Sequence, residues 1–157
     1  MNEKDLFRAA LGLSSPWEVT QIEFDPNGKQ LDLYLDFAKG SLFACPECGS
    51  LCPAYDTEER SWRHLNFFEH LCYLNARQPR VKCHEHGVLT INVPWARPRS
   101  GFTLLFEALV ITFGQNGMTP SAISRIVGEH DTRLWRVLVP YPINSVKNNK
   151  KNMQPFS

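Results

Sequence analysis

Two short stretches decide the fold: residues 45–49 read CPECG and residues 83–87 read CHEHG. In each stretch two metal-ligating residue types are separated by two positions and followed by Gly, so a tight loop can aim both side chains at one centre. Together the two stretches predict a closed, four-ligand site for structural zinc. The expected ligands are Cys45, Cys48, Cys83 and His86.

In the second stretch we prefer His86 to His84, because Cys-x2-His repeats the spacing of the first stretch. The 34 residues between Cys48 and Cys83 exceed the roughly 12–20 of common zinc fingers, and an inserted β-hairpin and loop would account for them. Four protein ligands leave no position for water, so we do not expect a hydrolytic zinc. Cys52 is a competing fourth ligand. The alternative to a metal site is a pair of buried thiols beside a surface imidazole.

The cysteine count and the N-terminus indicate a reduced, cytoplasmic environment. Five cysteines is an odd number, and polar residues 2–5 follow Met1 where a secretory leader would be apolar. The longest apolar stretch, residues 104–113, contains Glu107 and is too short to span a bilayer. We therefore expect neither a disulfide scaffold nor a membrane protein, and we interpret Cys52 and Cys72 as ordinary buried residues.

A net charge of +1 conceals an uneven distribution of charge. Residues 1–59 contain 4 Lys/Arg and 11 Asp/Glu, whereas residues 60–101 contain 7 and 2. A polyanion would bind at this basic middle segment. The basic residues that precede residues 83–87 have two possible roles. They contact phosphates, or they form a solvated face of the sheet whose charge balances that of the acidic residues. These cations are Arg60, Arg63, Arg77, Arg80 and Lys82.

The first part of the chain is predicted to be rich in β-strands. A short helix is expected at residues 6–11, ended by Gly12. Apolar and polar residues largely alternate over 19–24 and 31–37, with an Asp-Pro-Asn-Gly turn between them, which indicates a hairpin. Further strands are expected at residues 67–76, 80–83 and 88–93.

After residues 94–101, predicted as a linker, the apolar period changes to that of helices. Helices are expected from 105 to about 117, from 120 with Thr119 as N-cap, and over 132–139. The sequence thus predicts an α+β protein. Its expected parts are a β-rich, zinc-ribbon-like domain at 1–97, a three-helix helix-turn-helix domain at 98–140 and a disordered tail at 141–157.

Residues 120–139 have the proportions of a helix-turn-helix, with a turn at Gly128. Leu134, Val137 and Leu138 would face the core, which leaves the other side of the second helix for a DNA major groove. Pro98 would hold the neighbouring arginines extended for a minor groove. The expected DNA contacts are Arg97, Arg99, Thr132, Arg133, Trp135 and Arg136. The alternative is a plain three-helix packing unit with exposed arginines.

Several uncommon short sequence motifs occur in a fixed order along the chain. They are CPECG at 45–49, RSWRHL at 60–65, YLNAR at 73–77, PRVKCHEHG at 79–87, VPWARP at 93–98, FTLLFEA at 102–108 and GEHDTRLWR at 128–136. Over about residues 5–138 the sequence thereby resembles the N-terminal region of bacterial insertion-sequence transposases of the ISL-three family. The resemblance implies a zinc-binding domain followed by a helix-turn-helix that recognises the terminal repeats of the element.

In that family a catalytic domain follows, with an RNase-H-like fold and an Asp/Asp/Glu metal triad. Here no Asp or Glu occurs after Asp131, so no residue of the chain can be assigned to the triad. We therefore expect a truncated transposase without enzymatic activity and without a small-molecule substrate. Its expected location is the bacterial cytoplasm, in association with the nucleoid.

Two hypotheses of function follow. The first is a zinc-stabilised fragment that binds double-stranded DNA at the terminal repeats. The second is a zinc-ribbon interaction module that binds or inhibits a full-length transposase, suggested by the expected exposure of Trp95 and Trp135. Binding to DNA that falls with salt would favour the first, and binding to the transposase without DNA the second.

Overall fold

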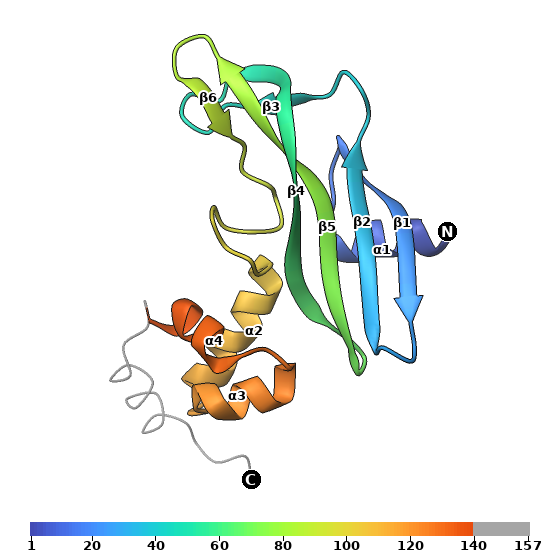
Figure 1. The fold of residues 1–157 in the computed structure, drawn as a ribbon, viewed down its shortest axis with the longest axis vertical. Coiled ribbons are helices and arrows are strands. Elements are labelled where there is room, and N and C mark those ends of the chain that lie inside the picture. Colours follow the sequence, from blue (N-terminus) through green and yellow to red (C-terminus); the bar gives the residue numbers. More distant parts are fainter. Residues whose placement is uncertain (140–157) are drawn as a thin grey trace. The chain divides into compact units, whose positions relative to one another are not determined.

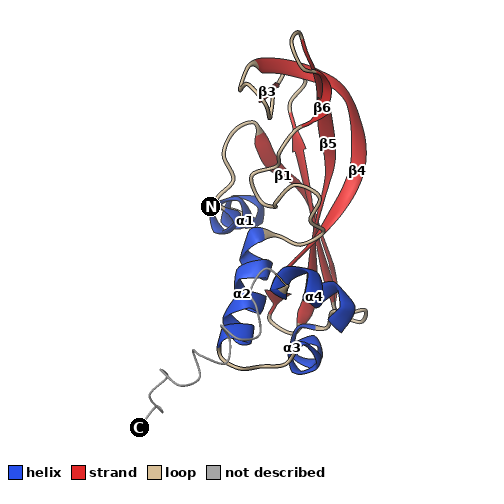
Figure 2. Ribbon diagram, turned by 90° about the vertical axis from the view of Figure 1, so that its left-hand side faces the viewer, coloured by secondary structure: helices blue, strands red, loops and turns tan. Residues whose placement is uncertain are grey.

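The computed structural model describes residues 1–139 and divides the chain into two compact units, Met1–Thr103 and Leu104–Ser157. The first unit contains one helix and a six-stranded sheet, and the second contains three helices within the described residues (Figures 1 and 2). The protein is therefore of mixed α+β class, as predicted. The expected tail at 141–157 lies outside the described residues.

The sheet of the first unit has the order β1-β2-β5-β4-β3, with β6 paired to β5. Its strands are β1 (Trp17–Asp25), β2 (Gln30–Phe37), β3 (Leu42–Ala44), β4 (Leu51–Phe67), β5 (His70–Cys83) and β6 (Gly87–Thr90). β1 and β2 form the predicted antiparallel hairpin, whereas β2 and β5 run parallel. The strand β5 pairs with β2 through residues 71–76 and with β6 through residues 80–83, so it links the main sheet to the far end of the unit.

Alternation of residue types explains how the sheet buries one face. On β2, Leu31, Leu33 and Leu35 are buried, while the intervening Asp32 and Tyr34 are only half-buried. β5 contributes Leu74 to the same core, and the aromatic rings of Trp17, Trp62 and Trp95 meet edge to face there.

Helix α1 (Glu3–Leu11) is better defined than the sequence suggested. Asn2 and Asp5 form a capping box at its start, and Gly12 ends it in the left-handed conformation, with φ of 64°. Phe7 and Leu11 pack against the core of the sheet, so α1 lies on one face of it (Figure 2).

The long strand β4 was not predicted. Its middle, residues 55–59, is polar and exposed, so no alternation marks it, and it is held in place by pairing with β5. The expected strands at 67–76 and 80–83 are one strand, β5, which continues through Pro79. The turn before it is at residues 68–69, where Phe68 has φ of 54°. The expected strand at 88–93 ends at Thr90.

The second unit contains α2 (Leu104–Gln115), α3 (Pro120–Val127) and α4 (Asp131–Leu138), close to the predicted positions. Thr119 caps α3 as predicted: its Oγ1 accepts a hydrogen bond from the Ala122 N–H at 3.1 Å, and Pro120 takes the first helical position. Gly128 ends α3 with φ of 80° and permits the sharp turn into α4. Ile123, Val127, Leu134 and Val137 are buried.

Residues 94–101 are not an open linker. Trp95 and Ala96 are part of the core of the first unit, and the backbone of Arg63 on β4 bonds to Gly101 O and to the Thr103 N–H. The Ser100 N–H donates to Arg97 O at 3.1 Å, which makes this segment a turn, and Arg99 adopts a left-handed φ of 65°. The expectation that Pro98 holds the two arginines extended is therefore wrong.

Candidate metal centre and helical hairpin

The four predicted zinc ligands lie on two turns at one end of the first unit. Cys45 and Cys48 lie between β3 and β4, Cys83 is the last residue of β5, and His86 lies between β5 and β6. The Gly49 N–H donates to Cys45 O at 2.8 Å, and the Cys45 N–H donates to Ser50 O at 2.8 Å, which closes the first turn. Gly49 and Gly87 have φ of 77° and 74°, the left-handed conformation for which a glycine was expected in each stretch. The inserted β4–β5 hairpin joins the two turns, as the long spacing indicated.

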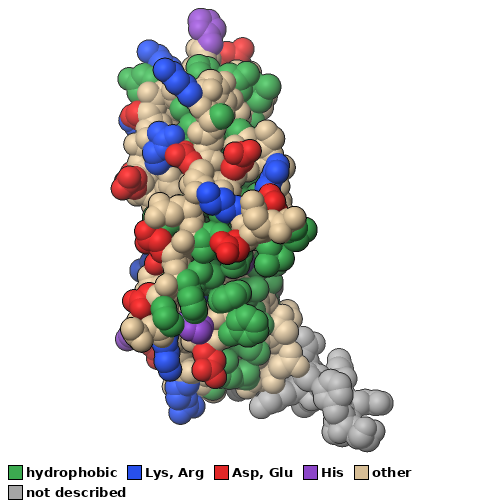
Figure 3. Space-filling model, turned by 90° about the vertical axis from the view of Figure 1, so that its right-hand side faces the viewer, with side chains coloured by type: hydrophobic (Ala, Val, Ile, Leu, Met, Phe, Trp, Pro, Cys, Tyr) green, Lys and Arg blue, Asp and Glu red, His purple; other side chains and the backbone are tan. Residues whose placement is uncertain are grey.

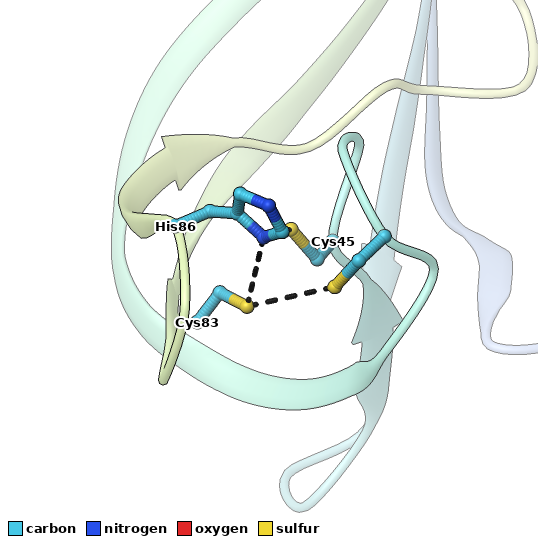
Figure 4. A group of neighbouring side chains, drawn as sticks. Cys45, Cys83 and His86 are labelled. Carbon is cyan, nitrogen blue, oxygen red and sulfur yellow. Dashed lines mark hydrogen bonds between the residues drawn. The ribbon is translucent and has the colours of Figure 1, made fainter.

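The ligand atoms converge on one point. Sγ of Cys48 and Sγ of Cys83 are 3.6 Å apart, and Nδ1 of His86 lies 3.5 Å from Sγ of Cys83 and 3.9 Å from Sγ of Cys45. All four ligand atoms lie within 4.8 Å of one another. Figure 4 shows the imidazole of His86 and the sulfur of Cys83 pointing toward one another from the same turn of the chain.

These separations fit a tetrahedral zinc. Zn–S bonds of about 2.3 Å and Zn–N bonds of about 2.0–2.1 Å at tetrahedral angles place sulfurs about 3.8 Å apart and sulfur and nitrogen about 3.6 Å apart. The observed distances lie close to those values. Zinc bound here would supply a structural crosslink between the two turns, because all four coordination positions are taken by the protein.

At Cys48 the surroundings favour the thiolate form that a metal requires. Hydrogen bonding from Ser50, through its hydroxyl and its backbone N–H, lowers the pKa of the Cys48 thiol to about 6. The pKa of His86 is raised, first by the contact with Cys83 and then by that with Cys48.

The other cysteines and His84 stand outside this centre. Cys52 and Cys72 are buried, in agreement with the sequence-based interpretation, and burial raises the pKa of both thiols, that of Cys72 to about 12. His84 is exposed and is not among the four clustered ligands, which supports the choice of His86.

The basic middle segment is largely engaged within the sheet. Arg77 pairs with Asp36 at 2.8 Å, Arg80 pairs with Asp56, and Arg60 donates to the side chain of Gln78. Arg63 is buried. On the face drawn in Figure 3, Lys and Arg side chains are interspersed with Asp and Glu. Of the two alternatives left open by the sequence, these contacts favour the sheet face that balances acidic residues.

The predicted DNA contacts lie at two places, one in each unit. Arg97 and Arg99 are exposed on the turn of the first unit. In the second unit Leu134 and Val137 of α4 are buried and Leu138 is half-buried, while the opposite side of the helix faces outward. The exposed residues on that side are Thr132, Arg133, Trp135 and Arg136.

Two further observations were not expected. Nη1 of Arg133 donates to Oε2 of Glu129 at 2.8 Å, and the side chain of Glu129 is 7% exposed. The spacing of four residues between an acid and a base is the signal that could have revealed this pair. Trp95 is 6% exposed and packs against Trp17, so its expected exposure is wrong, and only Trp135, at 41%, presents an open indole.

Comparison with known families gives two adjoining matches. Residues 41–86 match the model described as the zinc-finger of transposase IS204/IS1001/IS1096/IS1165, and residues 91–141 match the helix-turn-helix domain of transposase family ISL3. The chain is also 33% identical over 116 residues to a transposase for insertion sequence element IS1557 from each of two strains of Mycobacterium tuberculosis. The aligned part is 70% of this chain and 26% of those relatives, so the chain spans about a quarter of their length.

No solved structure matches the chain. None of the helices between residues 1 and 139 combines the length and apolar character needed to cross a bilayer.

Proposed function

Because this chain contains the zinc-finger and helix-turn-helix domains of ISL3-family transposases, we propose that it binds double-stranded DNA at the terminal repeats of an insertion element. The observation that carries this proposal is the outward face of α4. A helix of eight residues follows another of eight across a short turn at Gly128, and it presents two arginines, a threonine and a tryptophan to solvent.

In this proposal α4 is the helix that enters the major groove, within a three-helix domain formed with α2 and α3. Residues near the start of such a helix contact base edges, and Thr132 and Arg133 occupy that first turn. Arg136 follows one turn later and can reach a base or a phosphate. Arg97 and Arg99 add contacts to the DNA backbone or minor groove from the turn of the first unit.

Zinc has a structural role in the proposal. Structural zinc sites contribute an apparent binding energy of about 10–16 kcal/mol to the folded form, and here the metal would join the ends of β3, β4, β5 and β6. Cys48→Ser should lose the metal, whereas Cys72→Ser, which removes a buried thiol outside the cluster, should keep it. Metal analysis of the two purified variants, with the expected value of one zinc per chain for Cys72→Ser, tests this part.

DNA binding is tested by measuring affinity for a duplex containing the element's terminal repeat and for a scrambled duplex at two salt concentrations. Each phosphate neutralised adds about 0.9 to the slope of log affinity against log salt. Arg136→Ala should weaken binding and reduce that slope. Arg8→Ala, which removes an exposed arginine from α1, is the matched control and should change neither quantity. Equal and negligible affinity of the unaltered protein for both duplexes at low salt would refute the proposal.

A second candidate function is binding to a full-length transposase. The exposure of Trp135 and of Ile126, at 41% and 57%, favours it, because both are apolar surfaces on the helical hairpin. Retention of purified transposase by the chain in the absence of DNA, abolished by Trp135→Ala, is the expected result for this candidate.

A further inference from the structure

The first turn of α4 contains a cation at a place where a helix disfavours one. His130 is the N-cap, so Arg133 is the third helical residue and lies at the positive end of the helix dipole. Its guanidinium is joined to Glu129, which precedes the helix and compensates the unfavourable position. A basic residue at this position, where the helix dipole opposes it, suggests a role toward an anionic ligand.

Glu129 is itself held in a defined place. The Ser124 hydroxyl donates to Glu129 O at 2.5 Å, and the Gly128 N–H donates to Ser124 O at 2.9 Å, so the turn before α4 is fixed to the end of α3. The carboxylate is 7% exposed, whereas the side chain of Arg133 is 46% exposed. A buried acid therefore holds Nη1 of an arginine whose side chain is partly exposed.

This arrangement is suited to reading a base. A guanidinium has five N–H donors in a fixed plane, and guanine offers O6 and N7 as paired acceptors in the major groove. The bond from Nη1 to Glu129 restricts rotation of the group, which reduces the entropy lost when the guanidinium binds a base. Arg136, one turn further along the exposed face, has no ion pair with any residue of the described range 1–139.

We propose that Glu129 is a positioning residue that orients Arg133 toward a single guanine, and that Arg133 is the residue that determines sequence preference. Arg136 then contributes sequence-independent attraction to phosphate. This inference deepens the proposed DNA-binding function and rests on it.

The test is selection of bound sequences from a pool of short duplexes with randomised sequence, followed by affinity measurements on the preferred duplex and its single-base-pair variants. The unaltered protein should prefer G·C at one position by about tenfold or more over other pairs. Glu129→Gln should reduce that preference to less than about threefold, because the anchoring charge is gone. Affinity averaged over all sequences should not fall, since the substitution removes a negative charge from the binding face.

Two variants separate positioning from folding and from general attraction. Arg133→Lys retains a cation beside Glu129 but lacks the planar fork, so it should lose the same base preference while its salt slope stays within experimental error. This variant decides the matter if Glu129→Gln does not fold, as judged by thermal unfolding. Arg136→Ala should lower the affinity for every sequence by a similar factor and leave the preference at that base pair unchanged.

The possible failures are distinguishable. If the unaltered protein selects no sequence from the pool, the proposed function fails and this inference fails with it. If it selects a sequence and both Glu129→Gln and Arg133→Lys retain the preference at every position, the inference is wrong and the proposed function stands. If Arg136→Ala abolishes the preference, the roles assigned to the two arginines are reversed and the inference is overturned.

Discussion

At the scale of single residues, the ion pair of Arg133 and Glu129 couples the binding face to the stability of the second unit. Arg133→Ala leaves the buried carboxylate of Glu129 without this cation, and an uncompensated buried group costs about 1–3 kcal/mol. We expect the free energy of unfolding to fall by that amount.

Denaturant unfolding measures the difference, and Arg136→Ala is its control. That side chain is exposed on the same helix and has no described ion pair, so its removal should change the free energy of unfolding by less than about 0.5 kcal/mol. Equal free energies of unfolding for the two variants would show that solvent screens the Arg133–Glu129 ion pair and that the pair does not stabilise the second unit. A loss of DNA binding by Arg133→Ala alone therefore says little about base contact.

His64 should make the first unit sensitive to acid. Burial, and secondarily the charge of Arg63, lowers the pKa of His64 to about 4, from the ordinary value of 6.5. The unfolded chain therefore binds a proton between pH 6.5 and 4 that the folded chain does not. The contribution of the neutral, buried His64 to the free energy of unfolding is fully present above pH 6.5 and falls as the pH decreases to about 4. It amounts to at most about 3 kcal/mol.

The measurement is the free energy of unfolding as a function of pH. His64→Asn keeps a group able to bond to Thr103 Oγ1, which lies 2.8 Å from Nδ1 of His64, and it should flatten the profile between pH 4 and 6.5. His84→Asn removes an exposed histidine and should leave the profile as it is. An unchanged slope in His64→Asn would mean that other groups cause the acid sensitivity.

At the scale of elements, the sequence was informative where each segment specifies its own structure. The β1–β2 hairpin has its own alternation and turn, and α3 has its own cap and proline, so both were predicted close to their observed bounds. Strand β4 has neither signal over residues 55–59, because those side chains are exposed on both faces and β5 supplies the order. Local pattern cannot reveal a strand that depends on a partner.

The candidate metal centre could be predicted for the same reason, since each half is a local turn with its own glycine. For Glu129 the spacing of four residues to Arg133 could indicate the ion pair, but spacing alone does not show that the carboxylate is buried. The buried Trp95 was misjudged on similar grounds: proline and arginine neighbours suggested an exposed linker, whereas contact with Trp17 and Trp62 places its ring in the core.

The cap of α3 gives a prediction for one element. Thr119→Ala removes the oxygen that accepts from the Ala122 N–H, and losing an N-cap of this kind costs about 1 kcal/mol. Unfolding of the second unit, followed by helical circular dichroism, should shift to lower temperature. Thr112→Ala is the control, because that hydroxyl bonds back to Ala108 O within α2 and alanine is the better helix former there. A shift of equal size in both variants would contradict a specific role for the cap.

At the scale of the whole molecule, the two ends of the first unit depend on different forces. Around β2 and the first half of β5, the apolar side chains of Leu33, Leu74 and Trp62 are buried in the core, and we expect this part of the core to persist without metal. At the other end β3 has three residues and β6 has four, and short strands of this kind are stable only when something else fixes them. There a bound zinc would join the two turns on which Cys45 and Cys83 lie.

Removal of zinc by a chelator should therefore unfold one end of the first unit and spare the rest. Hydrogen exchange at the backbone amides of β3 and β6 should accelerate by orders of magnitude, while the amides of β5 that pair with β2, residues 71–76, remain protected. Helices α3 and α4 belong to the other unit and should keep their exchange rates. Uniform acceleration over residues 1–103 would show instead that the metal supports the entire sheet, because the hydrophobic core between β2 and β5 would then be too weak to persist alone.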